Sequence, residues 1–344
     1  MSEEKKNKDD VLKPAEAVDN TLTDEANKVG MGMGLNFKIM KLNDKFSHLS
    51  SKYLLKYYAR TKKRLFFLDY ESTLIDIDES LTEFTDVSES PNRHNAMAPN
   101  HRLLKILKHL TKDPNNLVFI MSKYETDFIS KFFKPLPTLG LCGENGFFYK
   151  YPHDDSYSQV ANISDWSWKE TVLKMLKVFT EKTEGSYIVE KNSCISWNYK
   201  HCDSYFGHIQ ANEIKTHISS IFGNKIEIVT GEGCVEIKPK DVNKAAFVAK
   251  VLQNEFKKEK IDFIFVVGDD NTDEEIFKYL KSAEKYFTNF GKRVKTITTV
   301  IGKKPSEAKY YFNEVNDCIE TLELLIRYNV SDKKENLSTR DLHY

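Results

Sequence analysis

The chain has 344 residues, enough for one large hydrophobic core and a second module, because a domain usually takes about 100–200 residues. Its 51 basic and 51 acidic residues give a formal net charge of zero. No global field would therefore draw the protein to nucleic acid or to a membrane surface, and a charged ligand must be held by local groups.

The composition also indicates a cellular compartment. The five cysteines are widely spaced without a C-x-x-C pair, which argues against zinc and favours buried thiols in a reducing cytosol. No run approaches the roughly 20 apolar residues of a membrane span. The charged N-terminus, MSEEKKNKDD, lacks the apolar stretch of a signal peptide. We therefore expect a cytoplasmic protein.

The two ends of the chain differ from its centre. Residues 1–27 are rich in Lys, Glu, Asp and Asn with almost no bulky apolar residues, which predicts a disordered charged tail. Residues 28–62 are expected to form a lead-in segment, in which LSSKYLLKYYARTKK predicts a helix with Leu54, Leu55 and Tyr58 on one side. Residues 331–344 are expected to form a flexible tail.

Short, continuous apolar runs predict the strands of a parallel sheet. Such runs, buried on both faces and separated by helical segments such as HRLLKILKHL, are typical of a sheet covered by helices. The fold class expected is therefore α/β. The runs are RLFFLDY (Arg64–Tyr70), NLVFIMS (Asn116–Ser122), LGLCGENG (Leu139–Gly146) and DFIFVVGDD (Asp262–Asp270).

The pattern changes between about Tyr151 and Lys238. A helix (WSWKETVLKMLKVFTEKT), two strands (SYIVEK, CISWNYK), a second helix (FGHIQANEIKTHISSIF) and a strand pair (KIEIVT, CVEIKP) follow one another. This order predicts an α+β domain inserted into the sheet domain. The expected organisation is a core of residues 63–149 and 240–330 with a cap at 150–239.

Polar residues end several of the predicted core strands. Asp69 and Ser122 each end an apolar run, and Asp269 with Asp270 ends a third. In open parallel sheets the ligand crevice lies outside the carboxyl ends of the strands, so we expect these side chains to converge. Crowded carboxylates repel one another unless a cation lies between them, and hard Mg²⁺ prefers such oxygen ligands.

Both acidic positions also have a plainer interpretation. A lone aspartate after a strand often caps a helix or a turn. An acidic helix N-terminus is favoured by the helix dipole, which accounts well for Asp273, Glu274 and Glu275. It does not account for the two aspartates at the strand end.

Five short motifs occur in a fixed order along the chain. They are LDYESTL (Leu68–Leu74), SKY (Ser122–Tyr124), GENG (Gly143–Gly146), VEIKPKDVNKA (Val235–Ala245) and GDDNTDEEIF (Gly268–Phe277). In this order they resemble the trehalose-6-phosphate phosphatases of the haloacid dehalogenase superfamily. The segments GMGMGLNFKIMKLNDKFSHL and TVIGKKPSEAKYYF resemble the C-terminal half of two-domain trehalose-phosphate synthase-like proteins. The resemblance implies a Rossmannoid core with an inserted cap.

The resemblance also implies roles for the residues of the core. Asp69 would attack the phosphorus to form an aspartyl-phosphate, and Glu71 would be the general acid and base. Ser122 and Lys244 would hold the phosphoryl oxygens. Without its flanking motif, Lys244 would be interpreted as an ordinary solvated helix lysine. The implied ligands of Mg²⁺ are Asp69, the backbone carbonyl of Glu71, Asp269 and Asp270.

The cap segment YIVEKNSCISWNYK resembles the family segment that holds the distal glucose. Carried over by position, the sugar contacts are Glu190, Lys191, Lys200 and Glu236. Val189 stands where the family has a glutamate, and Lys200 replaces an arginine. The alternative for all four residues is that they are ordinary solvent-facing strand positions.

The sequence departs from the family pattern around the expected site. Glu71 replaces a second aspartate and Ser72 a glycine, while Lys123 and Tyr124 stand for Gly-Arg and Asn145 for His. An extra methylene at position 71 displaces the proton donor, and loss of the arginine removes a bidentate contact. These changes favour reduced or altered activity, but they leave the nucleophile and the metal ligands in place.

The leading prediction is Mg²⁺-dependent hydrolysis of trehalose 6-phosphate to trehalose and phosphate. The first alternative is a catalytically weak or inactive regulatory subunit of a trehalose-synthesis complex, with a trehalose-phosphate synthase subunit as its partner. It rests on Glu71 and the altered SKY motif. The second alternative, a phosphatase for another sugar phosphate, rests on Val189 and Lys200.

Overall fold

The computed structural model describes residues 46–77, 97–231, 233–240, 242–258, 261–289 and 294–340. The chain divides into two compact units. The first unit comprises residues 1–76, 100–120 and 248–344, and the second comprises residues 77–99 and 121–247. The expected tail at 1–27 and the start of the lead-in segment lie outside the described residues. The second unit combines the expected cap with part of the expected core, so the core and cap boundaries stay a prediction.

The first unit is built on parallel strands. The larger sheet has nine strands, and six of them belong to this unit in the order β1-β13-β12-β11-β2-β3. The neighbours from β1 to β2 in this order are all paired in parallel, which confirms the α/β class. The strands are β1 (Ser47–His48), β2 (Arg64–Asp69), β3 (Asn116–Met121), β11 (Phe263–Gly268), β12 (Lys295–Ile301) and β13 (Tyr310–Phe312).

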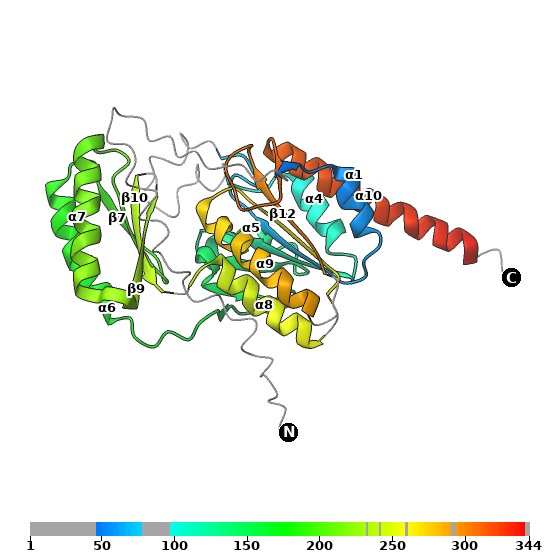
Figure 1. Ribbon diagram of the computed structural model, residues 1–344, viewed down its shortest axis with the longest axis horizontal. Coiled ribbons are helices and arrows are strands. Elements are labelled where there is room, and N and C mark those ends of the chain that lie inside the picture. Colours follow the sequence, from blue (N-terminus) through cyan, green and yellow to red (C-terminus); the bar gives the residue numbers. More distant parts are fainter. Residues whose placement is uncertain are drawn as a thin grey trace, which may run out of the picture. The chain divides into compact units, whose positions relative to one another are not determined.

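Helices lie on both sides of these strands (Figure 1). The helices α1 (Ser51–Tyr58), α4 (His101–Leu110) and α10 (Val315–Arg340) lie on one side, and α9 (Asn271–Asn289) lies on the other. Strands β2 and β11 are adjacent, and the next described helix of the first unit after each of them, α4 and α9, lies on the opposite face from the other. Such a point in an open parallel sheet is where a ligand crevice forms. Helix α10 includes residues 331–340, which were expected to belong to a flexible tail.

The two strands at this point are buried along their whole length. All six residues of β2 and all six of β11 are buried, as their continuous apolar runs predicted. The ring of Phe66 contacts those of Phe263 and Phe265 across the pair. Burying each such side chain contributes about 1.5–3 kcal/mol. On the predicted helix α1, Leu54 and Tyr58 are buried.

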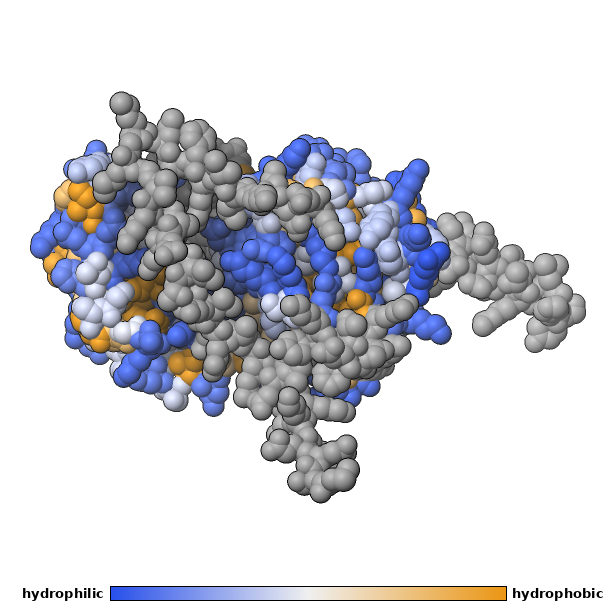
Figure 2. Space-filling view, in the orientation of Figure 1, coloured by the Kyte–Doolittle hydropathy of each residue, from blue (hydrophilic) through white to orange (hydrophobic). Residues whose placement is uncertain are grey.

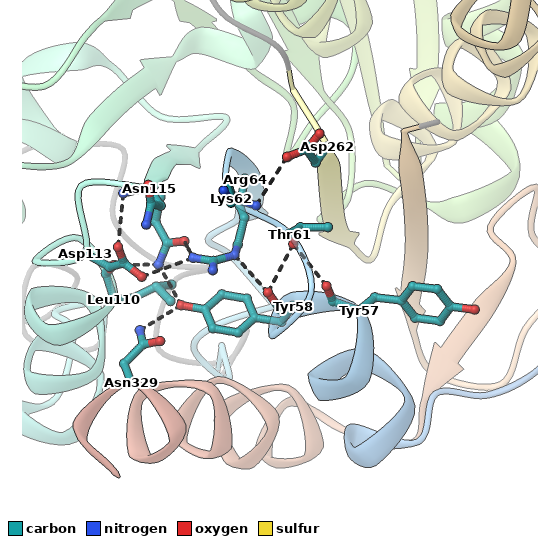
Figure 3. A network of polar contacts seen from close by, with 11 residues as sticks. Tyr57, Tyr58, Thr61, Lys62, Arg64, Leu110, Asp113, Asn115, Asp262 and Asn329 are labelled. Atoms are coloured by element: carbon teal, nitrogen blue, oxygen red, sulfur yellow. Dashed lines mark hydrogen bonds and ion pairs between the residues drawn. The ribbon is translucent and has the colours of Figure 1, made fainter. Parts of the chain in front are cut away.

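A buried arginine ties the start of β2 to its neighbours (Figure 3). The Arg64 guanidinium donates to the carboxylate of Asp113 at 3.0 Å, to Asn116 Oδ1 at 2.9 Å and to the carbonyl of Tyr58 at 3.0 Å. It also lies 4.0 Å from the centroid of the Tyr58 ring. The Tyr58 hydroxyl in turn accepts from Asn116 at 2.9 Å and from Asn329 at 2.7 Å. The network therefore joins α1, β2, β3 and α10.

Replacing Arg64 with lysine should lower the free energy of unfolding by about 1.5 kcal/mol, because an ammonium cannot make the same set of fixed hydrogen bonds. Urea denaturation measures this loss. The exposed Arg60 is the matched control, and Arg60→Lys should change stability by less than about 0.5 kcal/mol. Equal losses for both variants would show that the network does not stabilise the first unit.

The second unit contains a separate four-stranded antiparallel sheet in the order β7-β8-β10-β9. Its strands are β7 (Tyr187–Glu190), β8 (Ile195–Asn198), β9 (Ile226–Gly231) and β10 (Cys234–Pro239). The helices α6 (Ser167–Lys182) and α7 (Ser204–Phe222) cover one face (Figure 1). Trp197, Ile214 and Val235 belong to the core between the helices and this sheet. The predicted α+β elements are all present.

The remaining elements of the second unit include the turn that carries the GENG motif. They also include α5 (Thr126–Phe133) and β4 (Gly140–Gly143), and β4 pairs with β5 (Phe148–Lys150) in antiparallel orientation. A short 3-10 turn, Glu144–Gly146, joins β4 and β5, and β6 (Ser158–Gln159) follows. The long helix α8 (Lys244–Lys258) begins at the end of this unit.

The visible surface is largely hydrophilic, with apolar residues interspersed over α6 and α7 (Figure 2). The most exposed large apolar side chain there is Tyr205, with 79% of its surface accessible. In the described part of the chain, no helix combines the length and apolar character that crossing a membrane requires.

Candidate active site

Two aspartates lie at the carboxyl ends of adjacent parallel strands. The register pairs Leu68 of β2 with Val267 of β11, so the strands end side by side. Asp69 is the last residue of β2, and Asp269 follows directly after β11. The sequence predicted this convergence, and it falls at the point where helices leave the sheet toward opposite faces.

A third aspartate joins them. Asp69, Asp269 and Asp273 each offer a carboxylate oxygen, and the three oxygens lie within 4.8 Å of one another. Asp69 is 2% exposed and Asp273 is fully buried. The Thr73 hydroxyl lies 3.2 Å from Asp69 Oδ2 and 3.3 Å from Asp269 Oδ1, where it can donate to either. Its single hydrogen therefore helps to orient the carboxylate that accepts it, and the hydroxyl lies within reach of both.

The aspartates at the start of α9 differ in their local roles. Asp270 Oδ1 caps the helix, since it accepts from the backbone N–H groups of Thr272 at 2.8 Å and Asp273 at 3.1 Å. Asp273 Oδ2 reaches back to accept the backbone N–H groups of Asp269 at 3.1 Å and Asp270 at 3.3 Å. The two residues form a reciprocal cap of the capping-box kind. The helix-terminus interpretation thus explains Asp270 as well, although from the sequence alone it accounted only for Asp273, Glu274 and Glu275.

A glycine is required directly before these aspartates. A Cβ atom at Gly268 would lie 2.2 Å from Cγ of Asp273, far inside van der Waals contact. Only glycine lets the Asp273 carboxylate approach the backbone this closely. Gly268 of the GDDNTDEEIF motif is therefore needed to bring the Asp273 carboxylate close to those of Asp69 and Asp269.

Glu71 lies in a tight turn after β2. It is 4% exposed and forms an isolated bridge with Ile75, while the N–H groups of Leu74 and Ile75 donate to the carbonyl of Tyr70. Ser72 has a φ of 54°, a left-handed conformation that favours glycine. Burial, with a smaller contribution from the charge of Glu71, raises the pKa of Tyr70, so its phenol stays protonated.

Ser122 and Lys244 belong to the second unit. Ser122 directly follows β3, and its Oγ accepts the N–H of Tyr124 at 3.0 Å. Lys244 is the first residue of α8 and is only 1% exposed, so it is not the solvated lysine of the alternative interpretation. Burying an ammonium group is costly unless anionic or polar groups surround it. That Ser122 and Lys244 approach the aspartates of the first unit stays a prediction.

The register of the four-stranded sheet separates two of the expected sugar contacts. Glu236 pairs with Ser196, which pairs with Val189, so these three share one face. Glu190 instead pairs with Ile195, whose other partner Ile237 belongs to the core beneath α6 and α7. Glu190 and Glu236 therefore lie on opposite faces of the sheet.

The other two expected sugar contacts lie in loops. Lys191 directly follows β7, and its Nζ donates to the carbonyl of Lys123 at 3.1 Å. Lys200 is exposed and lies beyond β8, packed against Gly233, where an added Cβ would be 2.8 Å from that of Lys200.

Asp273 and Thr73 are members of the site that the sequence did not predict. Asp273 was assigned to the helix terminus because it lies in the first turn of α9, yet its spacing of three from Asp270 is the capping-box signal that folds it back. Thr73 lies within the LDYESTL motif, but nothing local indicates that its hydroxyl reaches both carboxylates.

The cluster of three carboxylates, from Asp69, Asp269 and Asp273, fits a hard divalent cation. Three carboxylates this close repel one another, and two of them are buried where water cannot screen the repulsion. A divalent cation bound by their oxygens would offset that repulsion. Asp69, Asp269 and Asp273 are the donors that the geometry brings together, and Asp270 still offers its second oxygen.

The parallel-sheet α/β fold, with aspartates at the carboxyl ends of adjacent strands, is of the haloacid dehalogenase type. Residues 67–316 match the family model described as trehalose-phosphatase. The chain belongs to the trehalose-phosphatase family.

Curated relatives extend over most of this chain. It is 31% identical over 314 residues to alpha,alpha-trehalose-phosphate synthase (UDP-forming) 5 of Arabidopsis thaliana, and the match covers 90% of this chain and 35% of that protein. It is 32% identical over 242 residues to a trehalose-phosphatase of Schizosaccharomyces pombe, covering 70% of this chain and 28% of that protein. The chain thus spans about a third of the length of such relatives.

Solved structures show the same fold. A trehalose-6-phosphate phosphatase of Aspergillus fumigatus is 30% identical with a TM-score of 0.61, and the match covers 82% of this chain and 99% of that one. The C-terminal domain of a trehalose-6-phosphate phosphatase of C. albicans is 27% identical with a TM-score of 0.69, covering 83% and 99%.

Proposed function

We propose that this chain hydrolyses trehalose 6-phosphate to trehalose and phosphate through an aspartyl-phosphate intermediate, with Mg²⁺ as its cofactor, in the cytoplasm. The observation that carries the proposal is the cluster of three carboxylates in a chain of the trehalose-phosphatase family. Asp69 and Asp269 lie at the ends of β2 and β11, and Asp273 lies in the first turn of α9. The cluster supports a phosphoryl-transfer site, because this chemistry depends on positioning and on charge stabilisation.

Asp69 is the nucleophile of the proposed reaction. One carboxylate oxygen attacks the phosphorus, and the bond from phosphorus to the sugar oxygen breaks. Glu71 protonates the departing sugar oxygen and then takes a proton from the water that hydrolyses the aspartyl-phosphate. The Thr73 hydroxyl holds the Asp69 carboxylate in one orientation, which favours attack from a fixed direction.

Ser122 and Lys244 are proposed to hold the phosphoryl oxygens. A buried ammonium and a buried hydroxyl act strongly on developing negative charge, because little water competes for them. Asp69, Asp269 and Asp273, the carbonyl of Glu71 and the second oxygen of Asp270 are the candidates to hold Mg²⁺. When bound, this ion supplies charge neutralisation between the carboxylates and the phosphate.

Mg²⁺ should raise the melting temperature by several degrees when it saturates the site, since a ligand of the folded state stabilises it by about 2.7 kcal/mol at a hundred times its Kd. Asp269→Ala should remove most of this shift. The exposed Asp127 is the matched control, and Asp127→Ala should keep the full shift. Differential scanning fluorimetry with and without Mg²⁺ measures it, and an undiminished shift in Asp269→Ala would place the cation elsewhere.

The sugar is proposed to contact Lys191, Lys200 and Glu236. Glu190 was expected to act beside them, but it lies on the opposite face of the sheet from Glu236. We therefore propose that the sugar contact which the family's glutamate makes is missing here, because Val189 stands at that position. Glu190 does not replace it, because it lies on the other face of the sheet. Affinities for trehalose 6-phosphate, glucose 6-phosphate and trehalose, measured side by side, test this selectivity.

A second candidate function is a regulatory subunit that binds the sugar phosphate and works with a trehalose-phosphate synthase subunit. The left-handed Ser72 favours it, because a side chain occupies a position where the family motif has glycine. The discriminating experiment is phosphate release by purified protein with Mg²⁺ from trehalose 6-phosphate and from other sugar phosphates. Binding of trehalose 6-phosphate without phosphate release would favour the regulatory subunit.

A further inference from the structure

In the turn after β4, the buried carboxylate of Glu144 is hydrogen-bonded to the loop between β7 and β8. Glu144 is 3% exposed and has no part in the proposed chemistry. Its Oε2 accepts from the Ser193 N–H at 2.7 Å and from the Ser193 hydroxyl at 2.5 Å. Its Oε1 accepts from Asn192 Nδ2 at 3.1 Å. Hydrogen bonds to an ionised carboxylate are roughly twice as strong as neutral ones, so they fasten residues 192 and 193 to the turn.

The turn is itself fixed on its other side. The Glu144 N–H donates to the carbonyl of Tyr124 at 2.9 Å, and the Asn145 N–H donates to the carbonyl of Ser122 at 3.1 Å. Glu144 and Asn145 have φ values of 48° and 52°. Non-glycine residues persist in this region only where their surroundings fix them. The turn is therefore a rigid support attached to the loop that carries Ser122.

Lys191 is held between this support and α6. Lys169 Nζ of α6 donates to the carbonyls of Lys191 at 2.5 Å and Asn192 at 2.8 Å, and the Lys191 N–H donates to the carbonyl of Cys194 at 2.9 Å. The backbone of Lys191 thus has little freedom. Its own ammonium reaches across to the carbonyl of Lys123, in the loop next to Ser122.

We infer that Glu144 is a positioning residue for sugar recognition. It sets the loop 191–193 so that the Lys191 ammonium stands beside the Ser122 loop, where it binds substrate hydroxyls. The identity of that sugar phosphate rests on the proposed function. Glu144 acts through the loop rather than by touching the substrate, because its two oxygens already accept three hydrogen bonds from Asn192 and Ser193.

The first test uses the free protein and needs no substrate. Glu144→Gln keeps the size of the side chain but leaves one acceptor oxygen, so it cannot accept from both Ser193 and Asn192 Nδ2, and its NH2 group faces the donor that is left over. Backbone amide exchange at residues 191–194, measured by hydrogen–deuterium exchange, should become at least about tenfold faster. Glu213→Gln on the exposed face of α7 is the matched control and should leave the exchange unchanged. Unchanged exchange in Glu144→Gln would overturn the inference.

The second test separates sugar recognition from chemistry. In Glu144→Gln, the KM for trehalose 6-phosphate should rise about tenfold while kcat falls less than about threefold. For an aryl phosphate, which has no sugar, kcat/KM should change less than about threefold. Lys191→Ala should show the same pattern, and the double variant should be no worse than Lys191→Ala alone, because the two residues act as a unit. Additive effects would overturn the inference.

These outcomes also distinguish this inference from the proposed function. If the protein binds trehalose 6-phosphate without releasing phosphate, and Glu144→Gln weakens that binding in calorimetry, the inference stands and the proposed activity fails. If phosphate is released but Glu144→Gln impairs both substrates equally, the activity stands and the inference fails. A protein that neither binds nor hydrolyses trehalose 6-phosphate would overturn both.

Discussion

Replacing Asp69 with asparagine should lower kcat for phosphate release by at least about a thousandfold, because the neutral amide cannot serve as the anionic nucleophile. Asparagine has the same shape and can still accept from Thr73, so the turn after β2 should keep its geometry. Removing one charge from a crowded set of carboxylates should leave the melting temperature without Mg²⁺ unchanged or higher. Steady-state phosphate release and a melting curve test both parts.

The matched control is Asp262, an aspartate that precedes β11 at the opposite end of the strand and accepts from the N–H of Lys62. Asp262→Asn should keep kcat within about threefold of the unchanged protein. Mass spectrometry of rapidly quenched protein should find phosphate on Asp69 in the unchanged chain and none in the variant. If Asp69→Asn keeps a tenth or more of the activity, another group is the nucleophile.

Replacing Glu71 with aspartate should raise kcat between about tenfold and a hundredfold if the chain is a working enzyme, since misplacing a catalytic group by about 1 Å can cost a hundredfold. Glu71 is buried in the turn after β2, so its longer side chain has little room to adjust. The affinity for trehalose 6-phosphate should hardly change, because this carboxyl group acts mainly on the leaving oxygen.

The conservative control for this change is Glu320→Asp on an exposed position of α10, which should leave kcat unchanged. The double variant Glu71→Asp, Ser72→Gly restores the family motif and should add stability of about 1 kcal/mol by relieving the left-handed serine. Turnover that stays near zero in the double variant would favour the regulatory subunit. A lower kcat in Glu71→Asp than in an active parent would show that the pocket has adapted to glutamate.

The sequence by itself determined four of the core strands, the fold class and the two principal aspartates. Runs such as RLFFLDY and FIFVVGDD predict buried strands because burial on both faces leaves a local signal, an unbroken apolar stretch. Polar residues at the ends of such strands then indicate a site, since parallel strands bring their carboxyl ends together. Asp69 and Asp269 were predicted in this way. Strands β1, β12 and β13 were not predicted; β1 and β13 have only two or three residues, which carry too little pattern, but the seven-residue β12 was missed although it is buried.

Only the tertiary structure decided which neighbours the functional side chains have. Asp273 joins the carboxylate group because the helix cap folds it back over Gly268, and Lys244 is buried although it looks like a surface lysine. Glu190 and Glu236 lie on opposite faces because strand register, which depends on pairing partners distant in sequence, fixes the face of every residue. Strand pairing joins residues far apart along the chain, and no local pattern records it, whereas the Asp273 cap is a local contact whose capping-box spacing is visible in the sequence.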